Sequence, residues 1–135
     1  MTAKEELSQY IHLQKYVDEK LEEYKRFEDR ATNTTTTLSD MARSSSEIKD
    51  RMAECVAKMA DISREYCKAC EDAERMKLQI ETKIGKVKQP YSLLLHYRYI
   101  RNMKLEEIAC KMGYTYDTIR HMHGEALQEY EKLTH

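Results

Sequence analysis

The feature that most constrains the fold is an unbroken heptad pattern in the middle of the chain. Between Ile48 and Ile80, uncharged and mostly apolar residues follow one another at alternating steps of four and three. They are Ile48, Met52, Cys55, Met59, Ile62, Tyr66, Ala69, Ala73, Met76 and Ile80. Residues at these steps share one face of an α-helix, so the pattern predicts a long coiled-coil helix. Lysines near its predicted end, around residues 85–89, complement the helix dipole.

A weaker heptad pattern runs through residues 1–31. Its positions are Leu7, Tyr10, Gln14, Val17, Leu21, Tyr24, Glu28 and Ala31. Gln14 and Glu28 weaken the pattern, and a second apolar face that includes Phe27 indicates more than one neighbour. Two such helices predict a coiled-coil hairpin, which would pack on the rest of the chain, on a second protomer, or on both.

The two heptad patterns are separated by a stretch rich in Thr and Ser, residues 32–46. Hydroxyl side chains compete for backbone hydrogen bonds and favour turns and caps, so we predict a loop there. Ser44 followed by Glu47 fits a capping box that opens the second helix. We therefore divide the chain into a helical hairpin over residues 1–88 and a C-terminal domain over residues 89–135.

The composition agrees with an all-α fold. The 135 residues include three Gly and one Pro, and 35% of them are charged. No apolar run approaches the roughly 20 residues of a membrane span, and the first ten residues are too charged for a signal peptide. We expect a cytoplasmic protein that does not contact a membrane.

The C-terminal domain has the spacing of a helix-turn-helix within residues 104–127, KLEEIACKMGYTYDTIRHMHGEAL. Gly113 suits the left-handed cap that ends the first motif helix, and Thr115 suits the N-cap of the next. Asp117 then falls in the first helical turn, where the helix dipole favours a negative charge. These local features all agree with one tight corner between two helices.

The last helix should bury one face and leave its polar N-terminal residues exposed. The predicted buried residues are Ile119, Met122, Ala126, Leu127 and Tyr130. A recognition helix contacts base edges with its N-terminal residues, and neighbouring basic residues hold phosphates. The candidate base contacts are Tyr116, Asp117, Arg120 and His121. The candidate phosphate contacts are Arg98, Arg101, Lys104, Lys111 and Thr115. The predicted partner is double-stranded DNA.

Residues 91–130 resemble region 4 of bacterial sigma-70-type factors, the domain that reads the −35 promoter element. The likeness is carried by Leu105-Glu106-Glu107-Ile108-Ala109, Met112-Gly113, Thr115, Ile119-Arg120 and Glu125-Ala126-Leu127. The resemblance implies that base contact falls to Tyr116, Asp117 and His121, with Arg120 close by. The chain departs from the family at Tyr116 and Thr118, where sigma factors usually carry arginine.

The whole chain is also similar to small bacteriophage proteins of unknown function that resemble late-gene transcription activators of the RinA and ArpU kind. The shared features are two long helices, the segment Thr35-Thr36-Thr37-Leu38-Ser39-Asp40-Met41, and an ending that includes Tyr99-Ile100 and Met112-Gly113-Tyr114. This resemblance implies a transcription regulator, an activator, encoded by a phage or prophage and acting in the cytoplasm of a Gram-positive host.

The charge of the C-terminal domain tempers this prediction. Its basic residues are Arg98, Arg101, Lys104, Lys111, Arg120 and Lys132, and its acidic residues are Glu106, Glu107, Asp117, Glu125, Glu129 and Glu131. A basic footprint is the usual mark of DNA binding, so a neutral monomer should bind weakly and gain from dimerisation through the heptad helices. A small-terminase-like packaging subunit, an adaptor for RNA polymerase, and a helix-turn-helix that serves only in packing stay open as alternatives.

Cysteine and histidine positions do not predict a metal site. Cys67 and Cys70 have the spacing of a zinc half-site, but no second pair of ligands follows. His121 and His123 are two residues apart and therefore point to different faces of a helix. We predict no metal and no cofactor. Paired acids, a nucleophile motif and a Gly-rich phosphate loop are not found in the sequence, so we predict no enzymatic activity.

Overall fold

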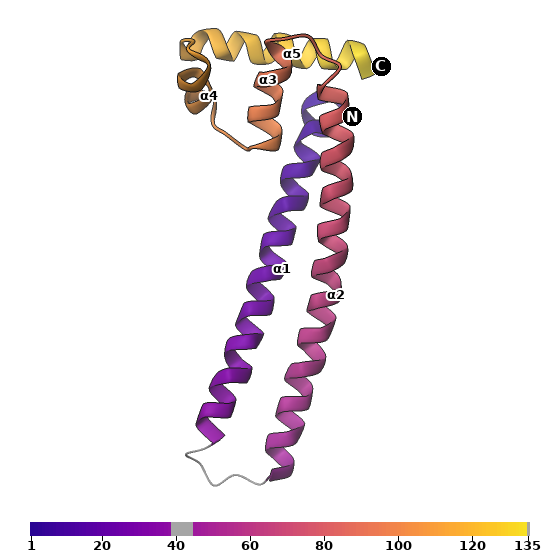
Figure 1. Cartoon of the computed structure of the whole chain (residues 1–135), viewed down its shortest axis with the longest axis vertical. Coiled ribbons are helices and arrows are strands. Elements are labelled where there is room, and N and C mark those ends of the chain that lie inside the picture. The colour runs from indigo at the N-terminus through magenta and orange to yellow at the C-terminus, as the bar shows by residue number, and fades with distance from the viewer. Residues whose placement is uncertain (39–44, 135) are drawn as a thin grey trace. The chain divides into compact units, whose positions relative to one another are not determined.

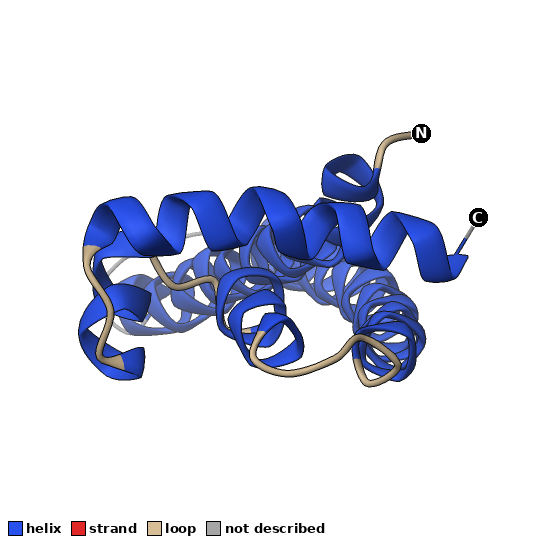
Figure 2. Cartoon of the chain, turned by 90° about the horizontal axis from the view of Figure 1, so that it is seen from above, coloured by secondary structure: helices blue, strands red, loops and turns tan. Residues whose placement is uncertain are grey.

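The computed structural model describes the backbone of residues 1–38 and 45–134, and the side chains of these residues except 33–38 and 45. Its elements are α1 (Ala3–Leu38), α2 (Ser45–Ile84), α3 (Tyr91–Leu95), η1 (His96–Ile100), α4 (Leu105–Met112) and α5 (Tyr116–Thr134). Within the described residues every regular element is a helix (Figure 2). The prediction of an all-α fold is confirmed.

The first helix is longer than the sequence pattern predicts. α1 continues to Leu38, into the stretch predicted as a loop from residue 32. Thr32 fits inside the helix because its hydroxyl donates a hydrogen bond to the carbonyl of Glu28, at 3.0 Å. Residues 39–44, with Ser44 of the predicted capping box, lie outside the described residues. 

A capping box is present at the start of α1, where it was not predicted. The Thr2 N–H donates to Glu5 Oε2 at 2.9 Å, and the Glu5 N–H donates to Thr2 Oγ1 at 3.2 Å. This reciprocal pair satisfies two backbone donors that a helix start would otherwise leave unpaired. Side chains therefore fix the first residue of the helix.

The chain forms two compact units. Unit 1 consists of residues 1–14 and 72–135, and unit 2 of residues 15–71. This division passes through both long helices, whereas the sequence suggested a boundary after residue 88. The reason lies in burial: Leu7 of α1 and Ile80 of α2 are buried in the same unit as the C-terminal helices.

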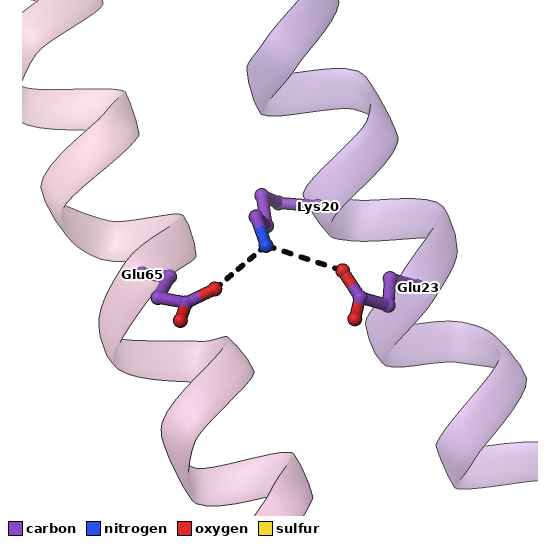
Figure 3. A network of polar contacts seen from close by, with 3 residues as sticks. All are labelled: Lys20, Glu23 and Glu65. Carbon is purple, nitrogen blue, oxygen red and sulfur yellow. Dashed lines mark hydrogen bonds and ion pairs between the residues drawn. The ribbon is translucent and has the colours of Figure 1, made fainter.

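In unit 2, α1 and α2 run antiparallel beside one another (Figures 1 and 3). Lys20 Nζ of α1 lies 2.6 Å from Glu65 Oε2 of α2, and Lys58 Nζ of α2 lies 5.6 Å from the centre of the Phe27 ring. Phe27 follows Lys20 by seven residues on α1, and Lys58 precedes Glu65 by seven residues on α2. This is the spacing expected of two antiparallel helices. Lys20 also contacts Glu23, and the two carboxylates raise the pKa of Lys20. Exposed ion pairs contribute little to stability, so their main effect here is on register.

Unit 2 buries little apolar surface. Among those of its residues whose side chains the structure describes, Val17, Ile62 and Ala69 are buried. Most other heptad positions are half-buried, but Met52 is 38% exposed, and the neighbouring Val56 is 61% exposed. A helix pair with so small a core gains little from the hydrophobic effect.

In unit 1, α3 and α4 both pack against α5, and α3 runs at a steep angle to it (Figures 1 and 2). Leu94, Ile108, Ala109 and Ile119 form a buried cluster that these helices share. Tyr130, further along α5, is fully buried, and burial together with the Glu6 carboxylate raises its pKa. These contacts fix the orientation of α5, the helix that carries the candidate site. No helix among the described residues is long and apolar enough to cross a membrane.

Candidate nucleic-acid interface

The corner between α4 and α5 is built from local backbone chemistry. Gly113 has φ 78°, in the left-handed region, and ends α4. The N–H groups of Gly113 and Tyr114 both donate to the Ala109 carbonyl, at 3.0 Å each. Thr115 caps α5, because its Oγ1 accepts from the Thr118 N–H at 3.2 Å. Both predicted caps, at Gly113 and Thr115, are confirmed.

Replacing Gly113 by Ala should lower the free energy of unfolding by about 1–2 kcal/mol, since a β-carbon disfavours the left-handed backbone. Space is not the reason, because an added Cβ would meet no atom within 4 Å. Gly113→Asn should cost less, because Asn tolerates this conformation better. Urea unfolding of the full chain, followed by circular dichroism, measures both changes. Equal stability of Gly113→Ala and the wild type would contradict this account.

The exposed face of α5 carries every candidate base contact. Ile119, Ala126 and Tyr130 are buried, and Met122 and Leu127 are half-buried, on one side of the helix. Asp117, Arg120, His121 and Gly124 are exposed on the other side, and Tyr116 is exposed in the first turn of the helix. Arg120 has no ion-pair partner among the described residues. Its guanidinium is therefore free to bind an external group.

Two of the candidate phosphate contacts converge on one aromatic ring. The Arg101 guanidinium lies 5.5 Å from the centre of the Tyr97 ring, and Lys111 Nζ lies 5.2 Å from it. Neither cation has an ion-pair partner within the described part of the chain. Both positive charges therefore lie beside the same ring, and each attracts an anion that approaches this part of the surface. The arrangement suits a phosphate group.

The remaining candidate phosphate contacts are placed differently. Arg98 is half-buried, and its Nη1 donates to the Met103 carbonyl at 2.9 Å, which holds the loop that precedes α4. The Thr115 hydroxyl is engaged in capping α5. Lys104 is exposed at the N-cap of α4. Arg101, Lys104 and Lys111 thus keep their charges available, whereas Arg98 and Thr115 support the structure.

The contact of the Tyr97 ring with these two cations was not predicted from the sequence. A local signal existed, because Arg101 follows Tyr97 by four residues and such pairs meet on a helix. Lys111 gave no such signal, because its approach to Tyr97 depends on how α4 packs against η1.

The neutral charge of the C-terminal domain conceals a marked asymmetry. Between residues 83 and 120 the basic residues are Lys83, Lys86, Lys88, Arg98, Arg101, Lys104, Lys111 and Arg120, and the acidic ones are Glu106, Glu107 and Asp117. Eight basic and three acidic residues give this segment a formal charge of +5. Within the neutral domain itself, residues 89–120 carry a formal charge of +2 and residues 121–135 a charge of −2, because Glu125, Glu129 and Glu131 lie in the later turns of α5. The part that would meet DNA is therefore basic.

A second pair missed by sequence reasoning joins α5 to η1. Tyr99 Oη lies 2.7 Å from His123 Nε2, and the two rings stack with centres 5.7 Å apart. Burial raises the pKa of Tyr99 to about 12. Burial also lowers the pKa of His123, and the charges of Arg98 and Lys4 lower it further. The structure therefore favours neutral His123, which fixes α5 against the segment that carries Arg98.

The free energy of unfolding should fall as the pH drops below about 6.5, the ordinary pKa of histidine. Below that pH an unfolded chain protonates His123, whereas the folded chain resists protonation because its pKa is lowered. The stabilisation from neutral His123 is therefore complete above about pH 6.5. It is lost as the pH falls toward the lowered pKa that His123 has in the folded protein. Urea midpoints at about pH 7.5 and 5.5 measure the effect. His123→Gln should reduce this difference, whereas His121→Gln, at an exposed position, should leave it unchanged.

No protein-family model, curated protein or solved structure matches the chain. Its function is therefore inferred from the helices and side chains described above. Cys67 is exposed and Cys70 half-buried on α2, and no three potential metal ligands among His, Cys, Asp and Glu come together within the described residues.

Proposed function

We propose that the protein is a sequence-specific DNA-binding transcription regulator that reads duplex DNA with α5, over residues 115–132. The observation that carries this proposal is the exposed, unpaired Arg120 in the early turns of α5, directly after a tight corner. Helix-turn-helix proteins place the N-terminal residues of the second helix against base edges. The proposed base contacts are Tyr116, Asp117, Arg120 and His121.

Arg101 and Lys111, the two cations beside the Tyr97 ring, support the proposal that the partner is DNA. Arg101 and Lys111, together with Lys104, would hold phosphates and set the register of α5 in the major groove. The formal charge of +5 over residues 83–120 supports the same orientation. A phosphate strand would thus meet basic residues although the domain as a whole is neutral.

We further propose that the protein binds as a dimer through the coiled-coil hairpin of α1 and α2. Support comes from the small core of unit 2 and from the exposed side chains of Met52 and Val56 on α2. Burying those side chains against a second hairpin would remove apolar surface from water. Two copies would also double the phosphate contacts, which offsets the weak attraction expected of one neutral domain.

The resemblances to sigma region 4 and to small phage proteins support the biological setting. They favour a regulator encoded by a bacteriophage or prophage, an activator, working in the cytoplasm of the bacterial host. An activator of this kind would contact RNA polymerase beside its DNA site.

Selection of bound sequences from a random duplex library tests the proposal. We expect one enriched motif, with two half-sites if the dimer forms. Three phosphate contacts for each protomer, from Arg101, Lys104 and Lys111, would make the affinity of one protomer fall about 40-fold between roughly 50 and 200 mM salt. Absence of enrichment, together with affinity that does not respond to salt, would refute DNA recognition.

Two alternative functions give different outcomes in the same preparation. A small-terminase-like packaging subunit would sediment as a ring of many protomers. An adaptor would bind RNA polymerase in a pull-down and show no enriched duplex. A salt-sensitive monomer or dimer with an enriched motif supports the regulator.

A further inference from the structure

At two of the three glycines, the backbone or its close neighbours explain why no larger residue stands there. At the third, the described residues give no such explanation. Gly113 adopts a left-handed backbone, and a Cβ at Gly85 would lie 3.3 Å from the Glu81 carbonyl oxygen. Gly124 lies inside α5, and a Cβ there would meet no atom within 4 Å. Glycine within a helix lowers its stability relative to alanine. Neither space nor backbone conformation within the unit explains why Gly124 is not a larger residue.

The position of Gly124 points to an external neighbour. At helical spacing it lies one turn after Arg120 and His121 and between them around the helix axis, and all three residues are exposed. We propose that the backbone of bound duplex DNA crosses α5 at Gly124, so close that no Cβ fits. This inference rests on the function proposed above and adds to it the path of one DNA strand.

The charges along this face of α5 favour that path. Toward the helix start the face carries Arg120, whereas after Gly124 it continues through Gln128 to the exposed Glu131. A phosphate strand that crosses at Gly124 stays near the arginine, and one that crosses a turn or two later meets a carboxylate. Gly124 therefore lies on the part of the face nearer the arginine, and the carboxylate of the adjacent Glu125 is engaged by the Tyr91 hydroxyl, which donates to it at 2.5 Å.

The same surroundings argue against a protein partner at Gly124. The exposed residues around it on this face are Asp117, Arg120, His121 and Gln128, all of them polar. Protein–protein interfaces are built around apolar and aromatic cores with few charges. A wet, polar surface with a free guanidinium is instead typical of DNA contacts.

The test compares Gly124→Ala and Gly124→Leu with the wild type in binding to the selected duplex and in thermal unfolding. Gly124→Ala should raise the unfolding temperature and yet weaken binding about tenfold, because the new methyl group meets the DNA backbone. Gly124→Leu should weaken binding further. Lys132→Leu, at an exposed position in the last turn of α5, should leave binding little changed.

The outcomes separate this inference from the function on which it rests. A wild type that binds no duplex refutes the proposed function, and the strand path with it. A wild type that binds, together with Gly124 variants that bind equally well, refutes only the strand path. The path is also refuted if Gly124→Leu keeps its affinity for DNA but loses association with RNA polymerase. If Gly124→Leu fails to fold, the DNA affinity of Gly124→Ala alone tests the strand path.

Discussion

Replacing Arg120 by Ala is expected to weaken binding to the selected duplex by about 10- to 100-fold and to abolish the preference for one base pair. A forked contact from arginine to guanine discriminates by about 1–3 kcal/mol, and about 1.4 kcal/mol corresponds to a factor of ten. Arg120 is exposed and has no ion-pair partner among the described residues. Its removal should therefore leave the helix content and unfolding temperature unchanged.

Lys132→Ala provides the matched control for Arg120→Ala. It removes one positive charge from the same helix, but near the far end, where Lys132 Nζ lies 3.6 Å from Glu129. Affinity should change little and the selected motif not at all. Library selection with both variants and the wild type in parallel measures these effects. An unchanged motif with Arg120→Ala would remove α5 from the role of recognition helix.

Replacing Ile119 by Ala should lower the free energy of unfolding by about 2–5 kcal/mol. Ile119 is fully buried on α5 and packs in one cluster with Leu94, Ile108 and Ala109. Truncation leaves a cavity where helices α3, α4 and α5 meet, so the surrounding side chains lose contacts that they cannot recover. DNA binding should fall as well, because this cluster fixes α5 relative to the cations at Tyr97.

Two further variants, Ile119→Val and Leu93→Ala, provide comparisons for the loss of stability in Ile119→Ala. Ile119→Val should cost only about 0.5–1.5 kcal/mol, since it removes one methylene group. Leu93→Ala, on the neighbouring α3, should cost less than Ile119→Ala because Leu93 is 39% exposed. Urea unfolding measures all three. Equal losses at Leu93 and Ile119 would show that the cluster does not determine the stability of the unit.

The sequence predicts well those features that depend on residues close together in the chain. The heptad steps from Ile48 to Ile80 lie within one helix, α2, as expected from their spacing. The caps at Gly113 and Thr115 depend on backbone chemistry within five residues, so their residue types alone were sufficient. The buried side of α5 likewise follows from its helical period.

Features that depend on packing between helices could not be predicted in this way. Lys111 reaches Tyr97, and His123 reaches Tyr99, only because α4 and α5 pack against η1. The π-helical turn of η1 itself has no local signature in His96–Ile100 that distinguishes it from an α-helix. Arg98, predicted from the sequence as a phosphate contact, donates a hydrogen bond to the Met103 carbonyl, a partner that no spacing rule reveals.

The compact units show a related limit. A heptad pattern tells which face of a helix is buried, but not what covers that face. Leu7 and Val17 belong to the same heptad pattern and are both buried, yet Leu7 belongs to unit 1 and Val17 to unit 2. One helix therefore contributes to two cores.

The two-segment makeup of unit 1 determines the order in which the protein can mature on the ribosome. Residues 1–14 emerge early, but their ion pair from Glu6 to Lys83 spans 77 positions, and α5 emerges later still. Leu7 and Tyr10 lack their native cover until the residues from 72 onward, which complete unit 1, have been synthesised. Contacts of such long sequence separation also form slowly. The proposed DNA-reading surface therefore becomes complete only after α5 has been synthesised, so a prematurely terminated chain could neither occupy an operator nor compete for one.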